Sequence, residues 1–292
     1  MAEKFLARHT TATLRALLDD KKPLGALVPI GSTEPHGPHL GLGTDVMISA
    51  AACVRATELF ARKGPLGSVI APAVSYGVTE CAQGFAGAVS VPAAILTAYL
   101  GAICDGLLAQ GLRHVCLVNN HLEPAHDAAV RAAAAGRGNQ VSVACPLTKK
   151  WARTLDAEFK SGACHAGLYE TSIMMAAAPE FVDNAMRSVL APVPISLSKQ
   201  LEAGATTFAA MGMELAYAGD PAAASIEEGE RMIQRLAERV VGATTGRAGR
   251  TAAVRLADRR CTRAETSRGR CDRPGDRCRH PRPPPWRTPG HT

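Results

Sequence analysis

The sequence predicts an α/β fold in which a mostly parallel β-sheet carries helices on both faces. Short β-rich apolar runs alternate along the chain with helix-like segments, the pattern expected of such a sheet. The chain has 292 residues, of which 47% are apolar and 20% charged, so it can bury a large core. Aromatic residues make up only 4%. This scarcity favours closely packed helices on a sheet over a platform for stacking nucleic-acid bases.

The expected elements follow one another in strand–helix order. The runs "LGALVPIG" and "RHVCLVNN" are apolar and end in small or polar residues, as strands buried on both sides do. The last helix is defined by the period of its apolar residues. The expected strands are 24–31, 67–77, 113–120 and 140–146, and the expected helices are 45–62, 91–110, 122–136 and roughly 225–241.

We do not expect the chain to be exported or to enter a membrane. The first eighteen residues lack the apolar stretch of a signal peptide. The longest apolar stretch, 93–112, is interrupted by Asp105 and Gln110, which indicates a buried helix.

The cysteines indicate a reducing compartment. Their number, nine, is odd, and none form a C-x-x-C pair. Cys53, Cys104 and Cys116 lie in apolar surroundings typical of reduced core thiols. We therefore expect a cytoplasmic protein.

The basic character of the chain belongs to its last part. Residues 247–292 hold 13 Arg against four acids, a local net charge of +9 that exceeds the +7 of the whole chain. This segment has no apolar period, and five of its final twelve residues are proline. We therefore expect a folded domain over 1–246 and a disordered tail over 247–292. An Arg-rich tail can bind nucleic acid, but one Trp and no repeated motif do not favour that role.

One candidate site lies in "PIGSTEPHGPHLGLGTD", residues 29–45, directly after the first strand. Open α/β sheets place ligands at the carboxyl ends of their strands. Pro35 keeps the preceding Glu34 extended, so Glu34 and His36 should project to the same side. Asp45 follows near the start of the next helix.

A second strand end repeats this arrangement. "LVNNHLEP" places His121 and Glu123 two positions apart, just past an apolar run. Any one of these side chains alone is more often a cap, a turn or a surface group. Two such pairs together with Asp45 give five oxygen and nitrogen ligands, a set that fits two divalent ions sharing a carboxylate. Mixed His and carboxylate ligation suits Zn²⁺ or Mn²⁺.

Four blocks of the sequence resemble those of the creatininase (creatinine amidohydrolase) family, in the same order. They are "PIGSTEPHGPHLGLGTD", "NNHLEP", "HAGLYETS" (165–172) and "AGDPAAAS" (218–225). The resemblance covers about residues 24–240. It implies a three-layer α/β/α fold, a dinuclear metal centre and a homo-oligomer, in many members a hexamer.

The resemblance also implies roles for individual residues. Glu34 and His121 would ligate one metal, His36 and Glu123 the other, and Asp45 would bridge them. His165 would be the proton shuttle, with Glu170 close by. A hydroxide held between the two metals would attack a carbonyl and release the nitrogen of a C–N amide bond.

The chain departs from this family at two points. Many members read Asn-Gly-His-Gly-Gly-Asn at the second block and recruit the Glu of the third, so Glu170 would replace Glu123 if Glu123 turned away. Creatininases proper have an aromatic residue where this chain has Leu122, and tryptophans near the histidine of the third block. Here Trp151 is the only candidate. We therefore expect a small cyclic or linear amide other than creatinine.

Three further residues lie close to these motifs. We expect His39 to hydrogen-bond a ligand, and His126 to be a packed or surface group. Cys164 stands beside His165, but no supporting acid favours a thiol nucleophile. The segment "GFAGAVSVP" (84–92) is expected to form a pocket loop.

Together these features predict a metal-dependent amidohydrolase that acts on C–N bonds other than peptide bonds. One alternative keeps the metal site but acts as a deformylase, or as a ring-opening hydrolase on a sugar-derived substrate. The other is a non-catalytic binding protein whose basic tail binds nucleic acid.

Overall fold

The computed structural model describes residues 3–63, 66–147, 154–155 and 157–265. The chain divides into two compact units, residues 1–252 and 253–292, and the fold below is that of the first. Helix α10 (Ile226–Glu265) continues into the segment that we expected to be disordered. Alanine and arginine, which are good helix formers, are frequent there. The domain boundary at 246 stays a prediction, and residues 266–292 lie outside the described part of the chain.

A parallel sheet forms the centre of the first unit, as predicted. Its strand order is β2-β1-β3-β4, and every neighbouring pair is parallel. Each strand lies within a run expected from the sequence. The strands are β1 (Leu24–Ile30), β2 (Gly67–Ile70), β3 (His114–Asn119) and β4 (Val141–Ala144).

The long helices also lie where the sequence predicts them. They are α2 (Thr44–Lys63), α3 (Ala93–Ala109), α4 (Pro124–Ala134) and α10. The shorter helices were not expected from the sequence. They are α1 (Thr11–Asp19), α6 (Ala157–Ser161), α7 (Leu168–Ala177), α8 (Asn184–Val189) and α9 (Leu197–Glu202), with 3-10 turns at Leu6–Arg8, Pro179–Phe181 and Pro221–Ala223.

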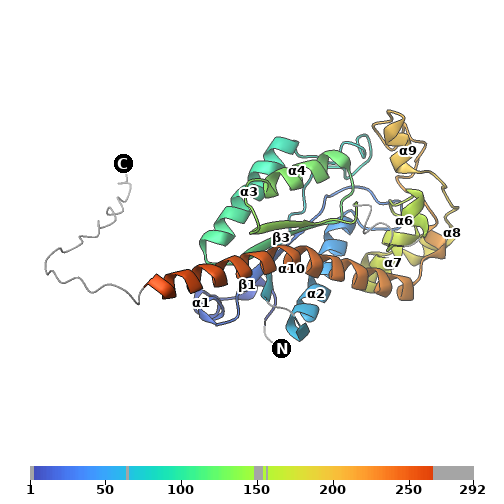
Figure 1. Ribbon diagram of the computed structural model, residues 1–292. Coiled ribbons are helices and arrows are strands. Elements are labelled where there is room, and N and C mark those ends of the chain that lie inside the picture. Colours follow the sequence, from blue (N-terminus) through green and yellow to red (C-terminus); the bar gives the residue numbers. More distant parts are fainter. Residues whose placement is uncertain (1–2, 64–65, 148–153, 156, 266–292) are drawn as a thin grey trace, which may run out of the picture. The chain divides into compact units, whose positions relative to one another are not determined.

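Helices cover both faces of the sheet, which gives three layers (Figure 1). Along β1, Leu27 packs into a core with residues of α2, α7 and α10, whereas its neighbours Ala26 and Val28 pack with residues of α3 and α4. Successive strand residues point to opposite faces, so a strand covered on both sides must be apolar throughout. All seven residues of β1 are buried accordingly.

A third, smaller apolar cluster is built mostly from loops. Phe208, Met211 and Met213 pack there against Cys81 and Ala163. None of the helices in the described ranges is both long enough and apolar enough to cross a membrane.

The predicted core thiols are in place. Cys53, Cys104 and Cys116 are fully buried free cysteines within the two main cores.

Candidate metal centre

The two predicted motifs meet because the two central strands end level with each other. Ile30, the last residue of β1, is the register partner of Asn119, the last residue of β3. The polar segments that follow them therefore leave the same edge of the sheet. Gly31 allows the start of α2 to approach the end of β1, since a Cβ on Gly31 would lie 2.6 Å from the Cβ of Asp45. This close packing places Asp45, in the first turn of α2, beside the end of β1.

A tight turn brings Glu34 and His36 to the same side, as the extended geometry predicts. Glu34 N–H donates to the carbonyl of Leu42, and His36 forms an antiparallel bridge with Leu40. Gly37 makes the turn possible with φ of 68°, a left-handed conformation that suits glycine. The Nε2 of His36 lies 3.8 Å from Oε1 of Glu34.

The second strand end is fixed by two asparagines. Asn119 holds the backbone of His121 from both sides: its amide donates to the His121 carbonyl at 2.9 Å and its oxygen accepts the His121 N–H at 3.1 Å. Asn120 donates to the hydroxyl of Ser49, which in turn donates to the carbonyl of Ile30. The position of His121 is therefore tied to both α2 and β1.

The third segment that supplies side chains to the site is the turn before α7. Ala166, with φ of 51°, donates its N–H to Oε2 of Glu170 at 2.7 Å. Ala218 donates its N–H to the carbonyl of His165, which fixes the other end of the turn. His165 and Glu170 thus enter the site from a separate part of the chain, as the resemblance implies.

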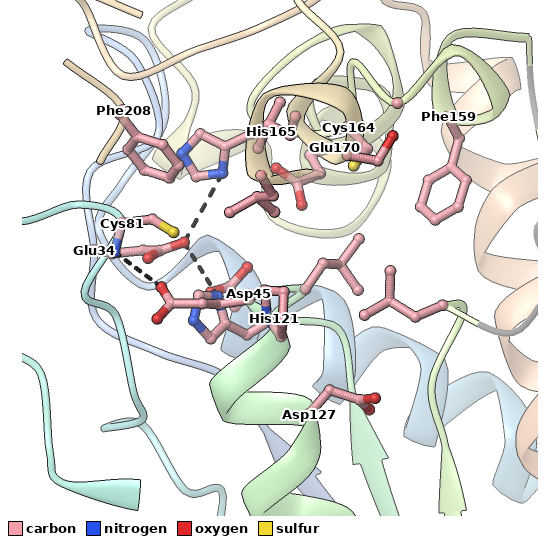
Figure 2. Close-up of a pocket in the computed structure, with 18 of the residues that line it drawn as sticks. Glu34, Asp45, Cys81, His121, Asp127, Phe159, Cys164, His165, Glu170 and Phe208 are labelled. Atoms are coloured by element: carbon pink, nitrogen blue, oxygen red, sulfur yellow. Dashed lines mark hydrogen bonds and ion pairs between the residues drawn. The ribbon is translucent and has the colours of Figure 1, made fainter. Parts of the chain in front are cut away.

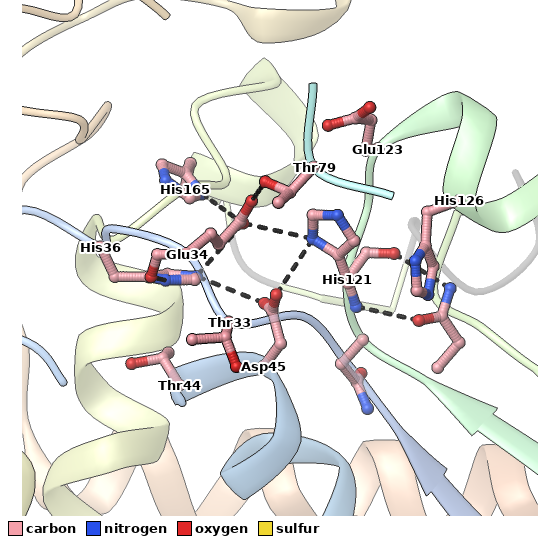
Figure 3. A network of polar contacts seen from close by, with 12 residues as sticks. Thr33, Glu34, His36, Thr44, Asp45, Thr79, His121, Glu123, His126 and His165 are labelled. Atoms are coloured by element: carbon pink, nitrogen blue, oxygen red, sulfur yellow. Dashed lines mark hydrogen bonds and ion pairs between the residues drawn. The ribbon is translucent and has the colours of Figure 1, made fainter. Parts of the chain in front are cut away.

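Three imidazoles in this site are held in the same way. His36 Nδ1 contacts the carbonyl of Glu34 at 3.1 Å, and His121 Nε2 contacts the carbonyl of Val78 at 2.7 Å. His165 Nε2 contacts the carbonyl of Pro35 at 3.0 Å. A carbonyl can only accept, so each of these nitrogens carries the proton. The other nitrogen of each ring then faces the carboxylates (Figure 3).

Asp45 lies between two groups of these side chains. Its Oδ2 is 3.0 Å from Nδ1 of His121, and its Oδ1 is 3.3 Å from Nε2 of His36. The groups close enough to hold an ion are Glu34–Asp45–His121, His36–Asp45–Glu170 and Glu34–His36–His165. All of these side chains are buried. Asp45 can therefore contribute one oxygen to each of two neighbouring ions.

The donor set fits metal ions. Nε2 of His36 and Oδ2 of Asp45 are buried and make no hydrogen bond within the described residues. Carboxylate oxygens and imidazole nitrogens gathered this closely in a buried site need positive charge between them, from protons or from a metal ion. His nitrogen and carboxylate oxygen are ligands that Zn²⁺ accepts, and a ring N–H bonded to a carbonyl is a common support for a ligating histidine.

The pKa values of the buried side chains also indicate that the site needs positive charge. Burial alone would lower the pKa of His36, but the carboxylate of Asp45 outweighs it and raises that pKa to about 10. Burial would raise the pKa of Asp45, but His121 and His36 hold it below its ordinary value. Burial raises the pKa of Glu170 to about 8. In the absence of metal, protons on the imidazoles balance the buried carboxylates.

Glu123 lies apart from the ligand groups of the described residues. Its two carboxylate oxygens each accept a backbone N–H at 3.1 Å, one from Glu80 and one from Cys81. Neither oxygen belongs to the groups of described residues that lie close enough to hold an ion. Glu170, which the sequence offered as the alternative to Glu123, does belong to one of these groups.

The two other histidines near the motifs have defined neighbours. His39 contacts the hydroxyl of Thr171 at 2.9 Å, a residue next to Glu170, rather than a ligand itself. His126 is fully buried, with its ring 4.6 Å from that of His121. It is thus a packed group, one of the two possibilities that the sequence left open.

Sequence reasoning missed Thr79. Its side chain is buried, and its hydroxyl donates to Oε2 of Glu34, which leaves Oε1 directed at His121. The only signal was a threonine in the polar stretch "GVTECAQG", just before the expected pocket loop.

A cavity of about 520 Å³ opens onto the metal centre (Figure 2). Glu34, Asp45, His121, His165 and Glu170 form one part of its lining. The rest is mainly apolar and includes Leu122, Leu147, Phe159, Cys164, Leu197, Leu201, Phe208 and Met211. Cavities of this size hold small organic molecules. Trp151, the expected aromatic candidate, lies outside the described residues.

The fold and the site together define an α/β protein with a buried centre of carboxylates and imidazoles suited to metal ions. The creatininase family model, described as creatinine amidohydrolase, matches residues 7–244. The chain belongs to the creatininase family of metal-dependent amidohydrolases, which confirms the resemblance seen in the sequence.

Relatives with different substrates match the chain. The mycofactocin precursor peptide peptidase of Mycolicibacterium smegmatis is 30% identical over 216 residues, 72% of this chain and 80% of that protein. The creatinine amidohydrolase of Pseudomonas putida is 26% identical over 178 residues, 54% of this chain and 65% of that enzyme.

Solved structures share the fold. A creatininase variant described as Zn–Zn type superimposes with a TM-score of 0.62 at 21% identity, covering 84% of this chain and 98% of that one. A creatininase described as the manganese form gives a TM-score of 0.59 at 21% identity, with the same coverage.

Proposed function

We propose that this protein uses two divalent metal ions to hydrolyse a C–N amide bond. The orientation of three imidazoles carries the proposal. His36, His121 and His165 each give a ring N–H to a backbone carbonyl and direct the remaining nitrogen at buried carboxylates. A ring N–H bonded to a backbone carbonyl is a common support for a metal-binding histidine, so this arrangement suits metal ions. We favour Zn²⁺ over Mn²⁺ because of the three imidazole nitrogens, and solved creatininases are described with either metal.

The two ions would be held by separate groups that share Asp45. Glu34 and Nδ1 of His121 would bind the first, together with Oδ2 of Asp45. Nε2 of His36 and Oε2 of Glu170 would bind the second, together with Oδ1 of Asp45. Glu170 thus takes the role that the sequence assigned first to Glu123.

The ions, when bound, would lower the pKa of a water molecule and stabilise negative charge on the substrate carbonyl. His165 would act as the general base and then as the general acid. Burial and the nearby His36 lower the pKa of His165 to about 4, so the ring is neutral at pH 7. Its Nε2–H stays on the carbonyl of Pro35, which leaves Nδ1 to take a proton and pass it to the departing nitrogen.

The cavity lining supports a small cyclic or linear amide other than creatinine as the substrate. Leu122 lines the cavity next to His121, and Phe208 stacks on His165 with ring centroids 4.4 Å apart. The described part of the lining offers apolar contact to the substrate and few polar groups apart from the metal centre and the charged residues Glu123, Asp127, Arg131 and Lys160.

A peptide amide is the second candidate. The observation that favours it is the match to mycofactocin precursor peptide peptidases, which covers 72% of this chain. Phe159 and Leu201 also line the cavity, which extends beyond the metal centre toward α6 and α9. A side chain next to the scissile bond would find apolar contacts there.

We further propose a cytoplasmic homo-oligomer, a hexamer by family resemblance, that does not act on nucleic acid. The buried thiols Cys53, Cys104 and Cys116 fit a reducing compartment. Ile95 and Tyr99, one turn apart on α3, are 59% and 57% exposed and would suit a contact between subunits. Light scattering of the purified protein measures this state.

Elemental analysis together with a substrate panel tests the proposed function. We expect two zinc ions per subunit and hydrolysis that is lost on chelation and restored by Zn²⁺. The panel holds creatinine, small linear and cyclic amides, formamides and short peptides. Activity that persists in metal-free protein would refute the metal mechanism, and good turnover of creatinine would refute the argument from the cavity lining.

A further inference from the structure

Two neighbouring residues in the loop between β2 and α3 touch two different members of the metal centre. The carbonyl of Val78 accepts the Nε2–H of His121 at 2.7 Å. The hydroxyl of Thr79 donates to Oε2 of Glu34. The segment Val78–Cys81 therefore sets the ring orientation of one metal-site residue and the rotation of the carboxylate of another (Figure 3).

The same segment is fastened by a side chain at every backbone N–H. Val78 N–H donates to Nδ1 of the buried His126 at 3.2 Å, and Thr79 N–H donates to the hydroxyl of Ser90 at 3.0 Å. Glu123 accepts the remaining two, from Glu80 and Cys81. A loop rarely has all its successive amides bonded to side chains, because most backbone bonds in proteins go to other backbone groups.

Two further contacts fix the ends of the segment. A Cβ on Gly77 would lie 2.3 Å from Nδ1 of His126, so the approach of the loop to this ring requires glycine. At the other end, the carbonyl of Cys81 accepts the N–H of Phe208 at 2.7 Å. Phe208 in turn stacks on His165, so the segment also supports the cavity wall.

Glu123 and Glu34 are thus linked through this segment. The two oxygens of Glu123 hold the amides of Glu80 and Cys81, and the residue before them, Thr79, holds Glu34. Loss of a group that orients a ligand in this way typically lowers metal affinity or activity about 10–100-fold.

We propose that Val78–Cys81 is a positioning segment for the metal centre, in which Thr79 orients Glu34 and Glu123 anchors the loop instead of ligating an ion. The inference rests on the proposed metal site. Thr79 is a positioning residue: it acts on Glu34 and does not touch substrate.

The first experiment compares Thr79→Val, Thr79→Ser and wild type in zinc affinity, measured by competition with a chromogenic chelator. We expect Thr79→Val to bind zinc about 10–100-fold more weakly and Thr79→Ser to restore most of the affinity. Thr57→Val is the matched control, since Thr57 is also buried but its hydroxyl bonds only the carbonyl of Val54 within α2. Unchanged affinity in Thr79→Val would overturn the role of Thr79.

The second experiment tests Glu123 with Glu123→Gln. We expect the variant to keep two zinc ions per subunit, while amide hydrogen exchange in 78–81 becomes faster than in wild type. Loss of one ion with unchanged exchange would instead make Glu123 a ligand and overturn its anchoring role. If Thr79→Val does not fold, the exchange of 78–81 in wild type and Glu123→Gln still decides the proposal.

Different results would refute the proposed metal-dependent function and the positioning role of Val78–Cys81. Wild-type protein that binds no zinc would refute the proposed function itself. Wild-type protein that binds two ions and hydrolyses amides, with Thr79→Val equal to it in both respects, would refute only the positioning segment.

Discussion

Nε2 of His36 lies 3.5 Å from Oε2 of Glu170, although the two residues lie far apart in the sequence. His36 belongs to the turn after β1, and Glu170 to the first turn of α7. The ring donates its Nδ1–H to the carbonyl of Glu34 on its other side, so Nε2 faces the carboxyl group of Glu170. In the absence of metal a proton on Nε2 balances the buried carboxylates, because the pKa of His36 is raised to about 10. A divalent ion between the two atoms would take the place of that proton, and the first prediction follows from it.

Glu170→Gln should lose one of the two ions. The substitution keeps the size of the side chain but removes the charge that would ligate the second ion. We expect about one zinc ion per subunit by elemental analysis and a fall in kcat of at least about 100-fold. Glu180→Gln, on an exposed turn, is the control. Two tightly held ions in Glu170→Gln would contradict this assignment of the second metal position.

His165→Gln should keep both ions and lose catalysis. His165 would move the proton, and general acid–base catalysis by a positioned side chain contributes about 10²–10⁴-fold in rate. We expect kcat to fall by that factor while KM changes little, as measured by steady-state kinetics on the best amide of the panel. A variant with wild-type kcat at full metal content would exclude a proton-transfer role for His165.

The pH dependence of the free energy of unfolding should reveal the lowered pKa of His39. Burial and the nearby His36 lower the pKa of His39 to about 4, from an ordinary value of about 6.5. Between these values the unfolded chain binds a proton that the folded chain does not, so His39 makes the protein less stable as pH falls from about 6.5 to 4. Glutamine at this position does not titrate.

Urea unfolding of metal-free wild type and His39→Gln at several pH values measures this effect. The stability of wild type relative to His39→Gln should fall as pH drops through that window and stay constant above pH 7. The metal-free state avoids a contribution from acid release of ions. A difference between the two proteins that is the same from pH 4 to 8 would contradict the buried neutral state of His39.

Gly31→Ala should destabilise the fold and weaken the metal site together. The added Cβ would lie 2.6 Å from both the Cβ of Asp45 and the backbone nitrogen of Val46, so the start of α2 would have to shift. Overpacking of this kind costs about 1–3 kcal/mol. Denaturant unfolding and zinc competition measure the two effects, and an alanine variant equal to wild type in both would show that α2 is not set by this contact.

A chain that ends at Gly246 should fold and retain activity. The residues of α10 that pack on the core within the described side chains all lie before this point and include Met232, Ile233, Leu236 and Val240. Tm measured by calorimetry should match that of the full chain within about 2 °C, with equal kcat. Loss of folding or of activity in the shorter chain would show that 247–292 is part of the functional unit.

The sequence alone predicted most of this fold. Alternation of apolar runs with helical segments located all four strands of the described sheet and its long helices, because burial on both faces leaves a strong local signal. It also predicted that Glu34 and His36 would point together, since Pro35 restricts the backbone locally. These features depend on neighbours in the chain, and the sequence shows those directly.

Tertiary structure decided what the side chains of the site touch. The spacing of His121 and Glu123 matches that of Glu34 and His36, yet Glu123 turns to two amides of a distant loop while Glu170 enters the ligand groups. Thr79 was not recognised at all. Which acid faces an imidazole depends on where loops far apart in sequence come together in space, and no local pattern of residues encodes that packing.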